Sequence, residues 1–243
     1  IAQIEDRYFQ NNVIDFDKDK YDKSGYRLFG GSVSFNGSTL NSRQFPIQGA
    51  REALVAQIFT GNESFRPGVN SENKKPVKEK HSWLQLSYMK EKYHKMGANW
   101  ILGWYLDAVY ASKNFSENYT ATMMQASEFA PTAHSKLTYN EAFRANQYVA
   151  AGIRPIYRLN QMFHVRGEFY GFLPIFPIER NSINKAYYGK AFSRFEYLGE
   201  ISVVCQLPFG AISAYVNHYS SPRREWNVGL TLGWQLFNYR FIE

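Results

Sequence analysis

Hydrophobic and polar residues alternate along much of the chain with a period of two, the spacing of a β-strand that has one apolar face. In residues 226–237 every even position up to Leu236 is large and apolar, whereas the odd positions between them are Asn, Gly, Thr, Gly and Gln. The same division predicts clear strands over 100–110, 147–159, 163–173 and 195–207, and weaker strands over 28–36, 52–60, 82–90 and 211–218. The sequence therefore predicts nine antiparallel strands and an all-β fold.

Alternation alone does not separate a soluble sandwich, whose apolar faces pack inward, from a membrane barrel, whose apolar faces meet lipid. The clear strands are about 10 to 13 residues long, near the length of about 9–11 that a tilted membrane strand needs. Their apolar faces contain no Lys, Arg, Asp or Glu, and a cation at mid-bilayer costs about 2–4 kcal/mol. After the first connection, long and short connections alternate, as they do in outer-membrane barrels. These observations favour an antiparallel transmembrane β-barrel; a soluble glycan-binding β-sandwich is the alternative.

Nine strands do not complete a barrel, because single-chain bacterial barrels normally have an even number of strands. Residues 1–25 contain five aspartates and show no clear period. We therefore expect an irregular segment over 1–25 and the barrel region over 26–243, unless the first segment adds a tenth strand. The remaining strands would come from an N-terminal region or from another chain.

Composition and charge fit this interpretation. Aromatic residues make up 17% of the chain, which is typical of a protein with two membrane interfaces, although mean hydropathy is only −0.44. The formal net charge is +7, and part of the excess lies in a run of Lys74, Lys75, Lys78 and Lys80. We expect this run to be a solvated outer loop that meets lipopolysaccharide phosphates. No motif for binding nucleic acid accompanies it, so we expect no nucleic-acid partner.

Residues 40–51 resemble a turn of the outer-membrane assembly and two-partner-secretion barrel superfamily. Arg43, Phe45, Pro46 and Gly49 match its pattern, whereas Asn41 stands where the pattern has Asp. Pro46 fixes φ and Gly49 can adopt a positive φ, which suits a defined periplasmic turn.

In that superfamily a long extracellular loop follows three strands later, folds inward and carries an Arg-Gly-aromatic motif. Here the longest connection, 111–143, stands in that place and is followed by Arg144 and then Ala145. The resemblance implies that Arg144 locks the loop; an ordinary lumen-facing arginine at a strand start is the equal alternative. Gly229, Leu232 and Trp234 resemble the last-strand signal that the outer-membrane assembly machinery reads.

Overall the chain most resembles the C-terminal barrel of Bacteroidetes-type patatin-like phospholipases and bacterial surface antigens. The resemblance spans residues 26–243 and implies the last nine strands of a sixteen-stranded barrel in the bacterial outer membrane, with a periplasmic C-terminus. It also implies a region that anchors, and helps to translocate, an attached lipid acyl hydrolase. An assembly or secretion pore of the same superfamily is the second function to weigh.

The sequence predicts no enzyme within this chain. A patatin hydrolase needs Gly-x-Ser-x-Gly, and the nearest segment, Gly30 to Ser34, lacks the second glycine. The five histidines are scattered singly, so no metal or cofactor site is expected. Seven charged residues are expected to face the lumen: Asp107, Arg154, Arg158, Arg166, Glu168, Glu196 and Glu200. Ion pairs that fill the lumen are favoured over an active site, because no Ser or His is expected on that face in matching register.

Overall fold

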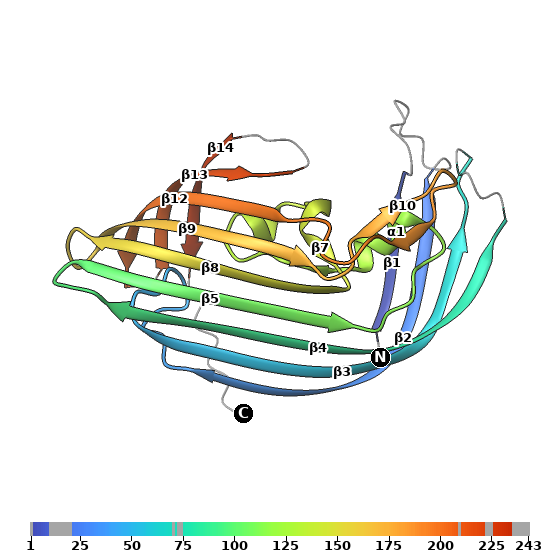
Figure 1. The fold of residues 1–243 in the computed structure, drawn as a ribbon, viewed down its shortest axis with the longest axis horizontal. Coiled ribbons are helices and arrows are strands. Elements are labelled where there is room, and N and C mark those ends of the chain that lie inside the picture. Colours follow the sequence, from blue (N-terminus) through green and yellow to red (C-terminus); the bar gives the residue numbers. More distant parts are fainter. Residues whose placement is uncertain are drawn as a thin grey trace.

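The computed structural model describes residues 2–9, 21–69, 71, 75–208, 210–221 and 226–234. Ten strands form one antiparallel sheet, and strands that follow one another along this sheet are hydrogen-bonded neighbours. In order they are β1 (Ala2–Tyr8), β2 (Asp22–Ser38), β3 (Gly49–Arg66), β4 (Val77–Lys95), β5 (Trp100–Ala111), β8 (Gln147–Arg158), β9 (Phe163–Pro174), β12 (Glu196–Leu207), β13 (Gly210–Tyr219) and β14 (Trp226–Trp234). Figure 1 shows that the sheet bends into a trough. No pairing among the described residues joins β1 to β14.

The prediction of an all-β antiparallel fold is confirmed, and each of the nine predicted strands is present. The last one is described as far as Trp234, so residues 235–237 of the prediction lie outside the described residues. Strands β2, β3 and β4 are much longer than predicted, at 17, 18 and 19 residues. Their extra length was missed because their outer ends are polar on both faces.

The sequence predicted an irregular segment over residues 1–25, but part of this segment is a strand. Residues Ala2–Tyr8 form β1, which pairs along its whole length with Asp22–Leu28 of β2. The expectation was wrong because β1 is short and Asp6 interrupts the face that carries Ala2, Ile4 and Tyr8, so no clear hydrophobic period results. The tenth strand, left open as an alternative, is therefore part of the sheet.

One long connection, residues 112–146, lies on the inner side of the trough and is called the plug segment here (Figure 1). It contains helix α1 (Tyr119–Gln125), two short 3-10 helices (Ser135–Leu137 and Glu141–Phe143) and a small hairpin of β6 (Ser127–Glu128) and β7 (Arg144–Ala145). No helix among the described residues is long and apolar enough to cross a membrane.

Aromatic rings fasten the plug segment to the sheet. Phe129 stacks on Phe172 of β9 with ring centroids 5.7 Å apart and an interplanar angle of 18°, and Phe143 packs against the same ring. Tyr148 and Tyr170 complete this buried cluster. A second contact comes from a hairpin of β10 (Ile178–Arg180) and β11 (Ala186–Tyr188), where Ile178 packs against α1. The hydrophobic core therefore lies between the sheet and its own plug, not between two sheets.

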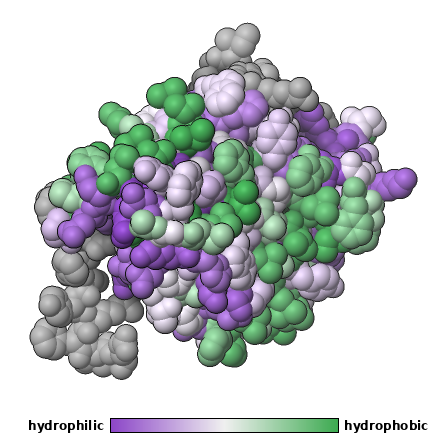
Figure 2. Space-filling model, turned by 60° about the vertical axis from the view of Figure 1, so that its left-hand side comes forward, coloured by the Kyte–Doolittle hydropathy of each residue, from purple (hydrophilic) through white to green (hydrophobic). Residues whose placement is uncertain are grey.

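The strands present their two faces to different surroundings, and we call the face beside the plug segment the inner face. On β5, β8, β9, β12, β13 and β14 the side chains of the opposite, outer face include no Asp, Glu, Lys or Arg among the described residues. Large apolar side chains are exposed there, among them Ile153 (52%), Ile201 (56%) and Leu230 (80%). Figure 2 shows hydrophobic residues gathered over a broad area of the surface beside hydrophilic ones.

Candidate functional site

A network of buried ionic side chains occupies the inner face near the middle of the sheet. Arg154 of β8 pairs with Glu91 of β4 and lies 3.7 Å from Glu168 of β9, and Arg166 pairs with the same Glu168. All four side chains are at least nine-tenths buried. Two arginines and two glutamates leave the cluster with no formal net charge, which is the condition for burying ions without a large uncompensated penalty.

Two tyrosine hydroxyls connect the charges. Tyr93 accepts hydrogen bonds from Arg154 (2.6 Å) and Arg166 (2.9 Å) and donates to Glu91 (3.1 Å). Tyr170 accepts from Arg154 Nε at 2.6 Å and donates to Glu168. The Tyr170 ring can lie across β8 because residue 152 is glycine: a Cβ there would come within 2.2 Å of the ring. The charged atoms are therefore bonded to fixed partners.

The turn between β2 and β3 folds onto the inner face of the sheet and covers one end of the network. Arg166 Nη1 donates to the carbonyl oxygen of Pro46 at 2.8 Å. Asn41 holds the turn together, because its Oδ1 accepts from the backbone N–H groups of residues 47 and 48, both at 3.0 Å. Gly49 has φ +94°, and a Cβ there would approach Thr39 O to 2.1 Å. Asn41 thus supplies the acceptor oxygen of the Asp it replaces in the predicted turn pattern.

The other two residues of the predicted turn flank Pro46. Phe45 itself has a positive φ of 49°, a conformation that an L-residue other than glycine rarely adopts. Arg43 lines the cavity beside the ionic network together with Phe45. The four residues singled out from the sequence are therefore close in space to the ionic cluster, a connection that the motif did not indicate.

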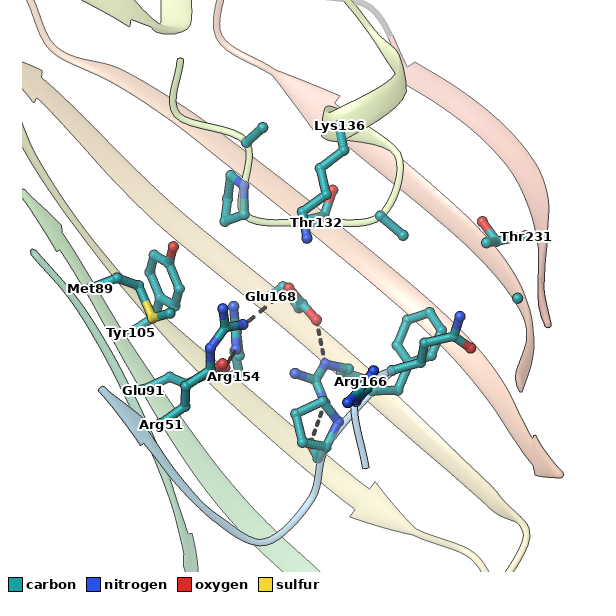
Figure 3. A pocket seen from close by; sticks show the side chains of 18 residues that line it. Arg51, Met89, Glu91, Tyr105, Thr132, Lys136, Arg154, Arg166, Glu168 and Thr231 are labelled. Atoms are coloured by element: carbon teal, nitrogen blue, oxygen red, sulfur yellow. Dashed lines mark hydrogen bonds and ion pairs between the residues drawn. The ribbon is translucent and has the colours of Figure 1, made fainter. Parts of the chain in front are cut away.

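A cavity of about 330 Å³ separates the network from the plug segment. Its floor is formed by Glu91, Arg154, Arg166 and Glu168, and Thr132 and Lys136 of the plug segment reach it from the opposite side. Figure 3 shows Glu168 joined by dashed lines to Arg154 and to Arg166, with Thr132 and Lys136 of the plug segment across the cavity. The arrangement can bind water or a small polar molecule, but its ionic groups already bond one another.

Three of the seven charges predicted to face the lumen, Arg154, Arg166 and Glu168, belong to the network. Glu200 of β12 is opposite Glu168 in the strand register, and the other three are on the inner face away from the network. Asp107 accepts from Tyr105 OH at 3.1 Å, and Arg158 donates to Ala98 O at 3.1 Å near a short connection. Glu196 binds Arg194 Nε at 2.8 Å, and Glu200 accepts from Asn217 at 3.4 Å.

Sequence reasoning missed two residues of this network. Glu91 and Tyr93 lay beyond the predicted strand 82–90, and the alternation continued to Lys95 would have placed both on the inner face. His164 and Ser202 lie buried on the polar faces that the alternation predicts for their strands. Because Ser202 is opposite Arg166, the expectation of no Ser or His in matching register is wrong. Since His164 Nε2 and Ser202 Oγ have no hydrogen-bond partner among the described residues, the two form no hydrogen-bonded dyad.

Arg144 organises the plug segment itself. Its Nη1 donates to the carbonyl oxygens of Met124 and Ala126, at 3.1 and 3.2 Å, where α1 ends. Its Nη2 binds Glu128 at 2.7 Å, and the guanidinium lies 4.6 Å from the Tyr139 ring centroid. All these partners belong to residues 112–146, so Arg144 ties the end of α1 to the β6–β7 hairpin. It is three positions before the first residue of β8 and is not at the start of a strand of the main sheet.

The predicted last-strand signal lies on β14 at the edge of the described sheet. Leu232 is 73% exposed on the outer face, and Gly229 lies under the Tyr215 ring on the inner face, where a Cβ would come within 2.4 Å of the hydroxyl oxygen. Trp234 pairs with Gly210 at the end of the strand.

One group of side chains could hold a divalent cation, although the sequence pointed to no metal site. Glu63 of β3 pairs in register with Glu79 of β4, and His81 is two residues further along the same face. One ligand atom from each lies within 4.8 Å of the others. His81 Nε2 is also 2.8 Å from Glu63 Oε2, so an ordinary hydrogen-bonded pair accounts for two of the three.

Comparison with known proteins yields no relative: no family model, curated protein or solved structure matches the chain.

Proposed function

We propose that this chain is part of a bacterial outer-membrane β-barrel that anchors an attached enzyme domain. The observation that carries the proposal is the distribution of polarity across the sheet. Six strands turn an outer face free of charged residues away from the plug segment, and the same strands bury arginine and glutamate on their inner face. This is the polarity of a barrel in lipid and the reverse of a soluble β-protein.

The soluble sandwich is the weaker interpretation. A sandwich buries its apolar face against a second sheet about 10 Å away. Here Val203 and Leu232, on the apolar face, are 49% and 73% exposed. Apolar patches on soluble monomers rarely exceed a few hundred Å², whereas this face extends across six strands. Lipid acyl chains would cover an apolar face of this extent.

Further strands are part of the proposal. Each unpaired backbone group in hydrocarbon costs several kcal/mol, and β1 and β14 have no strand on their outer edges among the described residues. Additional strands, from a region of the same polypeptide or from another chain, would close the barrel. The assembly machinery of the outer membrane would insert it, with Gly229, Leu232 and Trp234 as the recognised last-strand signal.

Anchoring, with translocation as a further role, is preferred to an open secretion pore because the inner side is occupied. The plug segment covers the inner face of the sheet, and the ionic network fills the space below it. The attached domain would be a patatin-like lipid acyl hydrolase, as the sequence resemblance implies. No catalytic step is assigned to residues of this chain.

The test is a comparison of two identical substitutions. Val203→Arg places a cation on the proposed lipid face, and Val69→Arg places one on an exposed connection outside the sheet. In lipid vesicles we expect Val203→Arg to lower the unfolding free energy of the full-length protein by about 2–4 kcal/mol. Val69→Arg should change it by less than about 0.5 kcal/mol. Equal effects, or a full-length protein that stays monodisperse without detergent, would overturn the proposal.

A further inference from the structure

The outer face of β1–β4 becomes strongly basic toward the end with the long connections. Six cations project from it, three on β1 and β2 and three on β3 and β4, and we call this group the outer basic patch: Arg7, Lys23, Arg27, Arg66, Lys78 and Lys80. Lys78 and Lys80 were predicted to lie in a solvated loop, but they belong to β4. Lys74, from the same predicted run, lies outside the described residues.

Strand register places these cations side by side. Lys23 pairs with Arg7 on one side and with Arg66 on the other, so three cations form one row across the sheet. In a second row Arg27 is opposite Asn62, and Asn62 is opposite Lys80. The one uncharged residue named in these two rows, Asn62, can form hydrogen bonds. Like charges directly opposite each other destabilise a sheet, so the patch has an energetic cost unless an anion covers it.

The described residues supply little compensating charge. Glu5 is the one acid on this surface, and it pairs with Arg7 (2.8 Å) and Lys23 (2.7 Å). Arg27, Arg66, Lys78 and Lys80 have no ion-pair partner in the described part of the chain. A depression of about 670 Å³ runs over the patch and is lined by all four and by Lys23, with Glu5, Glu63 and Glu79 also in its lining. Five cations therefore face an open concavity.

The patch borders directly on the apolar part of the same face. Phe29, two residues from Arg27, is 55% exposed, and Ile58 and Leu84 follow in the next row. Two residues along a strand span about 6.6 Å. If the apolar rows lie in the acyl chains, the cations lie at the depth of the lipid headgroups. The short turns are at the opposite end of the strands, so this headgroup layer belongs to the outer leaflet.

We propose that the outer basic patch binds the phosphate groups of a phosphorylated glycolipid of the outer leaflet. This inference rests on the proposed function, because it needs the sheet to lie in the outer membrane. Arginine and lysine are the side chains that bind phosphate oxygens through charge-assisted hydrogen bonds. Several phosphates on one headgroup would match several cations, and the neighbouring Phe29 row would contact the acyl chains. A lipid with both features fits the surface better than a free anion.

Two double variants of β4 test the proposal. Lys78→Gln with Lys80→Gln removes two cations from the patch, and Lys90→Gln with Lys92→Gln removes two from the same face of the same strand near its other end. The full-length protein is placed in phosphatidylcholine nanodiscs and titrated with diphosphoryl lipid A, with binding followed by energy transfer from tryptophan to a labelled lipid. We expect the first variant to bind about 25-fold more weakly, since each cation near an anionic surface contributes about fivefold. The second should bind as the wild type does.

Two further measurements, with inorganic phosphate and with phosphatidylglycerol, distinguish the possible sources of the bound phosphate. Inorganic phosphate should compete only weakly, and phosphatidylglycerol should bind less tightly than diphosphoryl lipid A. Equal loss in both variants, or equal binding of phosphatidylglycerol, would reduce the patch to general electrostatic attraction and overturn the proposal. Insertion is scored first by resistance to urea. If the wild type does not insert, the proposed function fails; if it inserts but the patch variant binds normally, only this inference fails.

Discussion

The outer face of β1–β4 and the outer face of the six strands β5, β8, β9, β12, β13 and β14 differ in where their charges lie. On the six later strands no outward side chain among the described residues is Asp, Glu, Lys or Arg. On β2–β4 the apolar rows have charged side chains beyond both of their ends. Arg27 and Lys80 lie beyond one end, and Glu52 and Lys90 beyond the other. Strands β2, β3 and β4 are also longer, at 17 to 19 residues against 9 to 12 for the six later strands. The alternation of apolar and polar residues therefore predicts the six later strands well and the first four strands poorly.

The inner faces differ in the same sense. The later strands hold Arg154, Arg166 and Glu168 of the buried ionic network, to which β4 adds Glu91, and an aromatic core against Phe129 and Phe143. The first strands meet the plug segment mainly through polar contacts, such as Asn118 with Tyr8 at 2.7 Å and Ser116 with Tyr26 at 2.9 Å. Among the described residues, the later strands therefore carry Asp, Glu, Lys and Arg on the inner face alone, whereas the first strands also expose such charges on the outer face. The three predictions that follow test this division.

The largest effect is expected from Glu168→Gln. The substitution keeps the shape of the side chain but removes the carboxylate that Arg154 and Arg166 share. Breaking a buried ion pair costs about 3–5 kcal/mol because an uncompensated charge is left behind. Urea unfolding of the full-length protein in lipid vesicles should show a loss of this size.

Glu52→Gln is the matched control in the earlier half. Glu52 pairs with Lys90 at 3.2 Å on the outer face, where the ions are exposed. Exposed pairs contribute little to stability, so no resolvable change in the unfolding midpoint is expected. A loss for Glu52→Gln as large as that for Glu168→Gln would remove the distinction between the two halves.

The same division explains how far the sequence could be interpreted. The strands at 100–110, 147–159 and 163–173 were predicted within a residue or so, because their outer faces are apolar along the whole length. β1 was missed and β4 was cut short because their outward residues are charged. Because the end of β4 was not predicted, Glu91 and Tyr93 were left out of the predicted lumen cluster. The Arg166–Pro46 contact joins residues 120 positions apart, and no local pattern could have indicated it.

Arg144→Gln should have an intermediate effect, confined to the plug segment. The variant loses bonds from a charged donor to the carbonyls that end α1 and to Glu128. Hydrogen bonds to charged groups contribute about 1.5–3 kcal/mol each, so amide exchange over residues 119–128 should accelerate at least about tenfold. Exchange near Phe129 should change less, because its aromatic packing on the sheet remains.

Lys136→Gln provides the control for Arg144, since Lys136 is an exposed cation of the same segment. It should leave exchange over residues 119–128 unchanged. If the two variants gave the same exchange rates, the contacts of Arg144 with the carbonyls of Met124 and Ala126 would not be what holds α1 in place.

The smallest effect is expected from acid. His134 of the plug segment lies between Tyr219 OH (3.0 Å) and the Asn217 amide, which donates to its Nδ1 at 2.8 Å. Partial burial lowers the pKa of His134 below its ordinary value of 6.5. Docking of this part of the plug segment therefore favours the neutral imidazole. Its contribution is fully present above pH 6.5 and is lost as the pH falls through the lowered pKa.

Amide exchange of residues 132–138 should accordingly rise between pH 7.5 and pH 5, after correction for the intrinsic pH dependence of exchange. His134→Gln keeps a hydrogen-bonding side chain but cannot titrate, so its corrected rates should be the same at both values. Protonation would place a cation against the Asn217 donor, which the amide cannot compensate. The acid effect should also be absent over β1 and β2. Their contacts with the plug segment at Tyr8 and Tyr26 involve no histidine. An acid response of equal size there would mean that the two halves of the sheet release the plug segment together.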